Sequence, residues 1–305
     1  MRSMRRCNTV VLGGSGVAGT GIVGSLLEAG THVDVIDLQP PTHSHPNLGF
    51  IEADLREPAV VGRVAEYEQV VVAFGLLARG LGQRPRAAYE FNLNTTLSVV
   101  EAARRGHCRR FVFLSSAMVY DRGRASGPLA EEAAVVGRCG YTHSKLAVEH
   151  ALRCAVEADM APTLVLRPFT IFGPGPLRGD AGHLVGRWLE LVRAGEALTV
   201  HGDGTQTVDL VPSSVLGDTC ARFFTQDDAP ALQVLNGTCG RPTTIRALAQ
   251  QFCRHFPGAT VRTIAAPPTA TPSAQVWGDG SALEAFLGAP LPEPSIAVDT
   301  FLAGQ

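Results

Sequence analysis

The sequence predicts an α/β protein built on a doubly wound parallel sheet, followed by a smaller C-terminal α/β portion. Three observations support this prediction. Short apolar strands alternate with helical segments, a glycine-rich turn follows the first strand, and a stretch rich in Gly and Pro begins after Pro168. Alternating strands and helices are joined by right-handed crossovers, which give a parallel sheet covered on both faces. We therefore divide the chain into residues 1–167 and 168–305, and expect some later segments to return to the sheet.

The individual elements follow from the apolar pattern. Strands are expected at residues 8–14, 31–39, 48–55, 68–75, 109–116 and 161–169, and helices at residues 17–30, 86–105, 139–150 and 183–195. Short apolar runs bounded by Gly or charged residues are typical of buried strands, whereas longer amphipathic stretches are typical of helices. Residues 170–182 and 264–275 are rich in Gly, Pro and Thr, so we expect loops there.

The composition is that of an ordinary soluble globular protein. Of the 305 residues, 45% are hydrophobic and 18% are charged, and the net charge is −2, so no nucleic-acid-binding surface is expected. The seven cysteines include no C-x-x-C pair, which favours reduced thiols and a cytoplasmic location. No apolar run approaches about 18 residues without Gly or charge, so no membrane span is expected. His43 and His45 have no acidic or Cys partner nearby, and no metal site is predicted.

The glycine-rich turn indicates a dinucleotide site in residues 1–167. Gly13, Gly16 and Gly19 lie between the first strand and the first helix, where backbone N–H groups can approach a pyrophosphate. Asp37 ends the next strand, about 20 residues further on, as expected for a carboxylate that binds a ribose 2′-hydroxyl. No arginine lies in the adjacent stretch "DLQPPTHSHP" to receive a 2′-phosphate. The sequence therefore predicts a Rossmann-type sheet that binds NAD rather than NADP.

Tyr141 and Lys145 lie four residues apart in a helical stretch, "CGYTHSKLAVEH", and so share one helix face. An ammonium close to a phenol favours the ionised phenol, so the pair suits acid–base chemistry. The spacing alone is weak evidence, because Tyr and Lys fall four apart by chance in many helices.

The glycine spacing, Gly-x-x-Gly-x-x-Gly rather than Gly-x-Gly-x-x-Gly, resembles the short-chain dehydrogenase/reductase superfamily, and the resemblance covers most of the chain. Asn92 matches the first residue of the family's Asn-x-x-Gly-Thr motif at the start of a helix, with Thr95 in place of the glycine. The resemblance implies cofactor contacts from Gly13, Gly16, Val17, Ala18, Gly19, Asp37, Asp54, Leu55, Ala73, Phe74, Gly75, Asn92, Tyr141, Lys145 and Pro168.

The stretch "FLSSAMVYD" resembles the extended branch of the family, the NAD-dependent epimerase/dehydratases, and implies that Ser116 joins Tyr141 and Lys145 as the catalytic set. In that branch, dehydratases carry an Asp-Glu pair directly after the catalytic hydroxyl. Here Ala117 and Met118 occupy those positions, and neither can transfer a proton. The resemblance therefore implies an enzyme closer to the 4-epimerases, although a reductase or dehydrogenase needs the same three residues.

The substrate side departs from the family pattern in two motifs. "LRPFTIFGPG" resembles an Arg-Pro-x-Asn-x-Tyr-Gly-Pro signature, with Thr170 where Asn is usual and Phe172 where Tyr is usual. "GDGTQTVDL" resembles Gly-Asp-Gly-x-Gln-x-Arg-Asp-Phe, with Val208 in place of an arginine that commonly pairs with a substrate diphosphate. The implied substrate residues are Ser116, Ala117, Met118, Thr170 and Val208, and Arg178, Arg187 or Arg241 could supply the missing charge.

The leading hypothesis is a sugar 4-epimerase acting on a nucleotide sugar through a transient keto intermediate. Val208 favours the first alternative, an NAD(H)-dependent keto-sugar reductase or hydroxyl dehydrogenase whose substrate lacks a diphosphate. The second alternative is a non-catalytic NAD-binding protein on the same fold. The resemblance also implies a homodimer that forms through helices near residues 88–105 and 141–157.

Overall fold

The computed structural model describes residues 8–76, 85–123, 126–176, 184–265 and 275–305. Seven parallel strands form the central sheet in the order β11-β7-β5-β4-β1-β2-β3. They are β1 (Asn8–Leu12), β2 (His32–Asp37), β3 (Leu48–Glu52), β4 (Gln69–Val72), β5 (Arg110–Leu114), β7 (Thr163–Pro168) and β11 (Leu232–Gly237). The predicted doubly wound parallel sheet is therefore confirmed.

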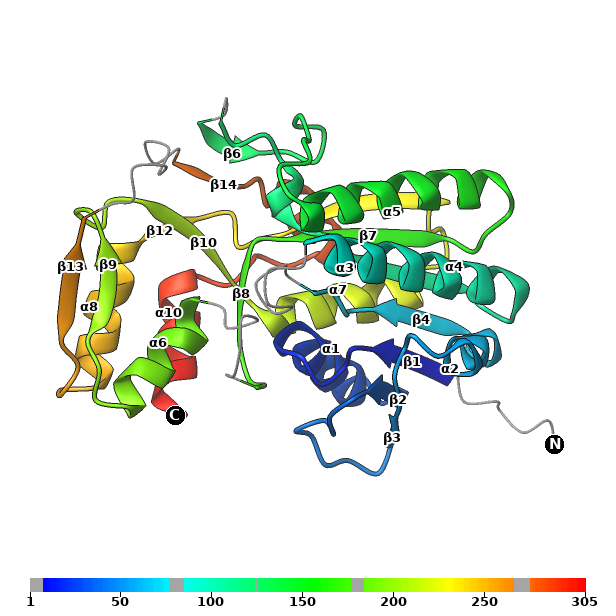
Figure 1. The fold of residues 1–305 in the computed structure, drawn as a ribbon, viewed down its shortest axis with the longest axis horizontal. Coiled ribbons are helices and arrows are strands. Elements are labelled where there is room, and N and C mark those ends of the chain that lie inside the picture. The colour runs from blue at the N-terminus through cyan, green and yellow to red at the C-terminus, as the bar shows by residue number, and fades with distance from the viewer. Residues whose placement is uncertain (1–7, 77–84, 124–125, 177–183, 266–274) are drawn as a thin grey trace.

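Helices cover both faces of this sheet (Figure 1). One face carries α1 (Val17–Glu28) and α7 (Ser213–Thr225), and the other carries α2 (Pro58–Gly62), α4 (Thr96–Arg105) and α5 (Gly140–Glu157). Successive strand residues point to opposite faces, so Val11 packs in the α1 and α7 cluster while Val10 and Leu12 pack in the other. Both clusters bury apolar side chains almost completely, which explains why the strands read as continuous apolar runs.

Several segments from beyond Pro168 return to the large sheet. Strand β11 pairs with β7 along its whole length, and helix α7 packs against α1. The two helices approach closely at glycines: a Cβ on Gly21 would lie 2.4 Å from Ser213, and a Cβ on Gly217 would lie 2.6 Å from the Gly21 carbonyl oxygen. The N-terminal half of the chain therefore shares its core with segments from the C-terminal half.

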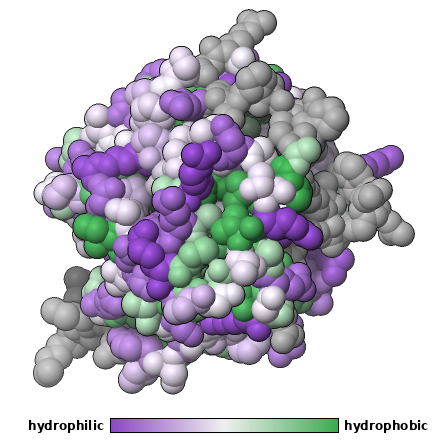
Figure 2. Space-filling model, turned by 90° about the vertical axis from the view of Figure 1, so that its left-hand side faces the viewer, coloured by the Kyte–Doolittle hydropathy of each residue, from purple (hydrophilic) through white to green (hydrophobic). Residues whose placement is uncertain are grey.

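The rest of the C-terminal half forms a separate apolar cluster around Trp188 and Phe252, at the left of Figure 1. Its helices are α6 (Leu184–Arg193), α8 (Ile245–His255) and α10 (Pro294–Ala303), whereas α9 (Ser281–Leu287) packs Leu283 into the cluster of α1 and α7. Its strands are β8 (Thr170–Phe172), β10 (Thr207–Pro212), β12 (Pro242–Thr244), β9 (Leu198–His201) and β13 (Val261–Ile264). A further short strand, β14 (Val276–Gly278), pairs with β6 (Gly127–Leu129) from the N-terminal half. Seen from this end, hydrophobic residues gather among hydrophilic ones near the middle of the face (Figure 2).

The structure differs from the sequence-based expectation in two local features. Residues 170–172, expected to begin a loop, form β8, because Thr170, Ile171 and Phe172 pair in parallel with β10. The helix expected at residues 86–105 is divided into α3 (Pro85–Glu90), a π-helical turn (Phe91–Thr95) and α4. Such turns widen a helix locally and occur often at functional sites. Here Phe91, Asn94 and Thr95 of the turn line the large cavity that is described below.

Candidate active site

A large cavity of about 2060 Å³ opens at the carboxyl ends of β1, β2, β4, β5 and β7. This is the edge at which open parallel sheets bind ligands. Its lining runs from Asp37 and Asp54 at one end, through Gly13, Phe74 and Lys145, to Met118 and Thr170 at the other. The cavity is large enough for a dinucleotide together with a second ligand.

The glycine-rich turn shapes the middle of the cavity, and its three glycines have different physical reasons. Gly13 has φ +80° and lies so close to β4 that a Cβ would come within 2.7 Å of the Phe74 nitrogen. Gly19 packs against the turn itself, since its Cβ would lie 2.3 Å from the Gly13 carbonyl oxygen. A Cβ on Gly16 would have only the Gly13 carbonyl oxygen within 4 Å, at 3.7 Å, and Gly16 lines the cavity. Gly16 therefore leaves open space for a ligand, whereas Gly13 and Gly19 serve packing, and Gly19 does not line the cavity.

The N-terminus of α1 is suited to hold a pyrophosphate. Gly16 is the N-cap residue, no side chain caps the helix, and the first turn contains no acidic residue. Val17 and Ala18, the first helical residues, line the cavity. Uncapped N–H groups and the positive end of the helix dipole favour an anion at this position.

The ribose and adenine end of the cavity carries two carboxylates. Asp37, at the end of β2, accepts hydrogen bonds from the Ser15 nitrogen (3.1 Å) and the Gln39 nitrogen (3.2 Å), which hold its carboxylate at the cavity wall. Asp54 forms an ion pair with Arg56. That contact keeps the pKa of Asp54 below its usual value, and Leu55 forms the wall beside it. Together with the glycine turn, these residues fit NAD.

Ala73, Phe74, Gly75 and Pro168 also line the cavity, but Asn92 does not. The Asn92 amide nitrogen donates to the Leu76 carbonyl oxygen (2.9 Å), and its amide oxygen accepts from the Leu76 nitrogen (2.8 Å). Both polar groups of this buried side chain are thus used on the main chain. The structure therefore corrects the expected direct contact: Asn92 holds the segment after β4 in place from behind the wall.

Ser116, Tyr141 and Lys145 come together at the centre of the cavity. Ser116 follows β5, where its hydroxyl accepts from the Met118 nitrogen (3.1 Å) and shares a hydrogen bond with Tyr141. Lys145 lies one turn along α5 and donates from Nζ to the carbonyl oxygens of Leu114 (2.7 Å) and Phe74 (3.4 Å). Its ammonium also lies 5.7 Å from the centre of the Tyr141 ring. Lys145 is the only lysine in the chain, which argues against a chance occurrence of the Tyr–Lys spacing.

Burial controls the ionisation of this set. It raises the pKa of the Tyr141 phenol, and the hydrogen bond with Ser116 opposes that change. It also lowers the pKa of Lys145 to about 7, against the opposing effect of the Glu149 charge. Lys145 was expected to lower the pKa of the phenol, but the effect of burial is larger and raises it. Desolvation disfavours the charged form of each group, and Lys145 is poised to gain or lose its proton near neutral pH.

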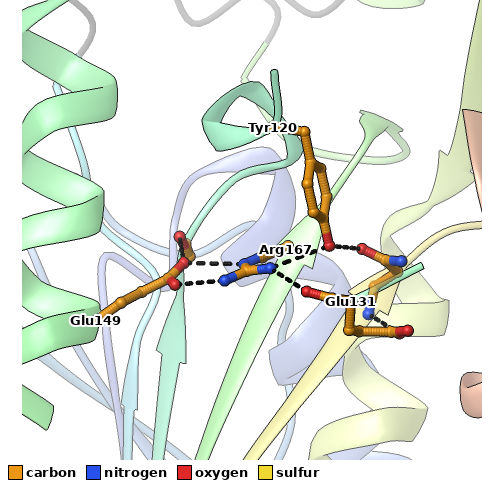
Figure 3. Close-up of polar contacts among 6 residues, drawn as sticks. Tyr120, Glu131, Glu149 and Arg167 are labelled. Carbon is orange, nitrogen blue, oxygen red and sulfur yellow. Dashed lines mark hydrogen bonds and ion pairs between the residues drawn. The ribbon is translucent and has the colours of Figure 1, made fainter. Parts of the chain in front are cut away.

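A buried polar network centres on Arg167 and Glu149 (Figure 3). Arg167 on β7 donates to the Glu149 carboxylate on α5 through two nitrogens, at 3.1 and 2.7 Å. The Ser115 hydroxyl donates to the same carboxylate at 2.5 Å. Arg167 also donates to the Tyr120 hydroxyl (3.2 Å) and the Glu131 carbonyl oxygen (2.8 Å). The network joins the residue before Ser116 to the helix that carries Tyr141 and Lys145.

Sequence reasoning did not find this network, although two signals pointed to it. Glu149 lies four residues after Lys145 and so occupies the same helix face. Arg167 is the arginine of "LRPF". The bidentate contact between them is stronger than a single neutral hydrogen bond and orients both side chains.

The substrate end of the cavity is lined by Met118, Thr170, Phe169 and Arg122. Ala117 and Val208 do not line it. Ala117 is fully buried in a small cluster with Tyr120, and Val208 packs against the C-terminal apolar cluster. Both positions were expected to contact substrate, and the structure corrects this because each side chain is used in packing. Arg122 was missed, since nothing in its local sequence distinguishes it from a surface arginine.

Two of the three arginines proposed to replace the missing charge are not found at this wall. Arg241 forms an ion pair with Glu293 at 2.5 Å, and Arg187 does not line the cavity. Arg178 lies outside the described residues.

Among the described residues, no group of three or more His, Cys, Asp or Glu side chains could hold a metal ion. None of the helices described is both long and apolar enough to cross a membrane.

Comparison with known proteins gives the family. The model of the NAD-dependent epimerase/dehydratase family matches residues 9–236. The uncharacterized protein y4nG of Sinorhizobium fredii is 27% identical over 267 residues, covering 86% of this chain and 64% of that protein. UDP-glucose 4-epimerase 1 of Oryza sativa is 26% identical over 280 residues, covering 80% and 78%.

A solved structure shows the same fold over almost the whole chain. UDP-glucuronic acid 4-epimerase from Bacillus cereus, in complex with UDP-glucuronic acid and NAD, superposes with a TM-score of 0.83 at 20% identity. The match covers 97% of this chain and 98% of that one.

Proposed function

The chain belongs to the NAD-dependent epimerase/dehydratase family and is an NAD-dependent enzyme, and from that premise we propose that it epimerises a nucleotide sugar at C4. One observation carries the proposal. Ser116, Tyr141 and Lys145 meet in the cavity, while the two positions after Ser116 hold Ala117 and Met118. The set can remove and return a proton at a sugar hydroxyl, but the positions after it offer no acid for loss of water.

The residues divide the work of moving one proton. Tyr141 takes the proton of the sugar hydroxyl and later returns it, and Ser116 donates a hydrogen bond to the same oxygen. Lys145, when charged, stabilises the Tyr141 phenolate. Bound NAD, held by the glycine turn and Asp37, would supply the hydride acceptor and donor for the sugar carbon. The buried contact of Arg167 with Glu149 holds α5 and the end of β5 in register, so that the two hydroxyls stay together.

The relatives support a nucleotide sugar as substrate. The similar rice protein is named for UDP-glucose, and the similar Bacillus cereus structure contains UDP-glucuronic acid and NAD. A UDP-hexose or UDP-hexuronate is accordingly the first substrate class to test.

A keto-sugar reductase or hydroxyl dehydrogenase is the second candidate. Val208 favours it, because this residue packs in an apolar cluster and brings no cation to a substrate diphosphate. Such an enzyme would use the same Ser116, Tyr141 and Lys145, but would consume or release NADH with each turnover.

The test uses protein purified without added cofactor. Denaturation releases the bound nucleotide for identification, and native protein is incubated with UDP-, dTDP- and GDP-hexoses while NADH absorbance is followed. Bound NAD with isomerised sugar and no net NADH supports the epimerase. A stoichiometric change in NADH contradicts it and supports the second candidate.

Tyr141→Phe tests the proposed role of the Tyr141 hydroxyl in proton transfer. Removal of the phenolic hydroxyl should lower turnover by roughly 100-fold or more, while the NAD content stays close to that of the wild-type protein. Tyr89→Phe is the control, because Tyr89 lies on α3 and does not line the cavity. Turnover retained by Tyr141→Phe would contradict the proposed mechanism.

We also propose a homodimer and a cytoplasmic location. The dimer rests on family resemblance and would use the surfaces of α4 and α5, which light scattering of the purified protein would test by mass. The location is supported by the six cysteines in the described residues, all of which are free.

A further inference from the structure

Arg122 places a positive charge at the substrate end of the cavity without a partner carboxylate. Three arginines line the cavity in the described part of the chain: Arg56, Arg105 and Arg122. Arg56 is paired with Asp54, and Arg105 with Glu101. Arg122 forms no ion pair with any described residue, unlike the other two. Arg122 is also an exposed residue of the cavity wall, so a ligand can reach its guanidinium.

The Arg122 guanidinium is held beside the catalytic set. One terminal nitrogen donates to the Ala117 carbonyl oxygen at 3.2 Å, one residue from Ser116. The guanidinium carbon lies 5.5 Å from the centre of the Phe169 ring, so the aromatic face supports it. A guanidinium has five N–H donors in a fixed plane. With one of them used on Ala117, enough remain to bind an anion through two parallel hydrogen bonds.

The charge of Asp209, on strand β10, also acts on this guanidinium. Loss of solvation lowers the pKa of Arg122, and the Asp209 charge opposes that change. Asp209 itself accepts hydrogen bonds from the Cys239 and Gly278 nitrogens, so it is not free to pair with Arg122. Arg122 thus supplies a cation at the substrate end of the cavity, where Val208 supplies none.

We propose that Arg122 binds an anionic group of the substrate, either a phosphate of the nucleotide or a carboxylate of the sugar. The proposal rests on the proposed function, because it requires a substrate that occupies this end of the cavity. A guanidinium binds both groups through the same bidentate geometry, so the source of the anion is decided by experiment.

The test is isothermal titration calorimetry on the NAD-loaded protein with UDP, UDP-glucose and UDP-glucuronate. Arg122→Gln should raise the Kd of each ligand that carries the recognised anion by roughly 10- to 100-fold. Arg122→Lys should recover part of the loss, because it keeps the charge but not the planar fork. Arg241→Gln is the control, since Arg241 lies outside the cavity and pairs with Glu293. Thermal unfolding would establish that each variant is folded.

The outcomes distinguish a phosphate contact from a carboxylate contact. They also distinguish failure of the Arg122 proposal from failure of the proposed epimerase reaction. Weaker binding of all three ligands identifies a phosphate contact, and weaker binding of UDP-glucuronate alone identifies a carboxylate contact. Kd values within about twofold of the wild type for all three ligands would overturn the role of Arg122. If the wild type epimerises a sugar and Arg122→Gln does so with the same KM, only the Arg122 proposal is wrong. If binding depends on Arg122 but no sugar is epimerised, only the proposed reaction is wrong.

Discussion

At the scale of the residue, Lys145 shows how burial sets the chemistry of the site. Its ammonium is enclosed by the carbonyl oxygens of Leu114 and Phe74 and by the Phe113 ring, whose centre lies 4.7 Å away. The charge of Glu149, one turn further along α5, favours charged Lys145, but Glu149 is itself paired with Arg167 on β7. Desolvation therefore dominates, and the pKa of Lys145 falls to about 7.

This pKa can be measured directly, because the chain contains no other lysine. Protein labelled with ¹³C-lysine should give one side-chain signal that titrates near pH 7 in the folded state. Glu149→Gln should move the midpoint to lower pH, since it removes the negative charge that favours charged Lys145 and leaves Arg167 uncompensated. A midpoint near 10.5, the usual lysine value, would show that the ammonium is solvated.

The same shift predicts how stability depends on pH. The unfolded chain keeps the Lys145 proton up to about pH 10.4, whereas the folded protein loses it near pH 7. Between these values the unfolded state binds more protons, so this residue makes the free energy of unfolding rise with pH. Its destabilising effect is fully present below pH 7 and is lost above the unfolded pKa.

At the scale of the element, the turn from β1 to α1 uses different glycines for packing and for ligand binding. The sequence predicts the turn well, because its glycines, the strand before and the helix after are all local signals. It does not distinguish the three glycines, since their roles depend on Phe74, which follows β4, and on open space beside Gly16. The same limit applies to Asn92, which does not line the cavity but holds Leu76, which does.

Two glycine variants should behave in opposite ways. Gly19→Ala places a Cβ 2.3 Å from the Gly13 carbonyl oxygen and should lower the free energy of unfolding by about 1–3 kcal/mol. Gly16→Ala adds a Cβ only where the cavity is open, at a residue whose φ of −74° suits alanine. It should change stability by less than about 1 kcal/mol but weaken NAD binding. Chemical denaturation and titration with NAD measure the two effects, and equal loss of stability in both variants would contradict this division.

The buried network shows why part of the site has no local sequence signal. Arg167 and Glu149 are 18 residues apart, and Tyr120 donates to Asn236 at 2.7 Å across 116 residues. These contacts exist only once β7, α5 and β11 are assembled. Tyr141 and Lys145 share a helix, and family resemblance linked Ser116 to them. Arg122 and Arg167 act only through contacts made in the folded molecule.

At the scale of the whole molecule, the two halves of the sequence do not fold into independent cores. The apolar runs predict the strands up to residue 168 because each is buried on both faces. They do not predict that α7 packs on α1 through Gly21 and Gly217, because this contact joins distant segments through residues without side chains. Strand β11 likewise completes the edge beside β7. The molecule should therefore unfold as one cooperative unit.

Both tryptophans make this prediction measurable, because they lie at positions 188 and 277 in the C-terminal half. Trp188 is buried and packs edge-on against Phe252 at 5.4 Å between ring centres, so its fluorescence reports on the C-terminal cluster. Gly21→Ala, in the N-terminal half, places a Cβ 2.4 Å from Ser213 and should lower the fluorescence midpoint and the circular-dichroism midpoint together. Gly62→Ala is the control, since nothing lies within 4 Å of its added Cβ. A fluorescence midpoint that stays in place while the circular-dichroism midpoint falls would show that the C-terminal half folds independently.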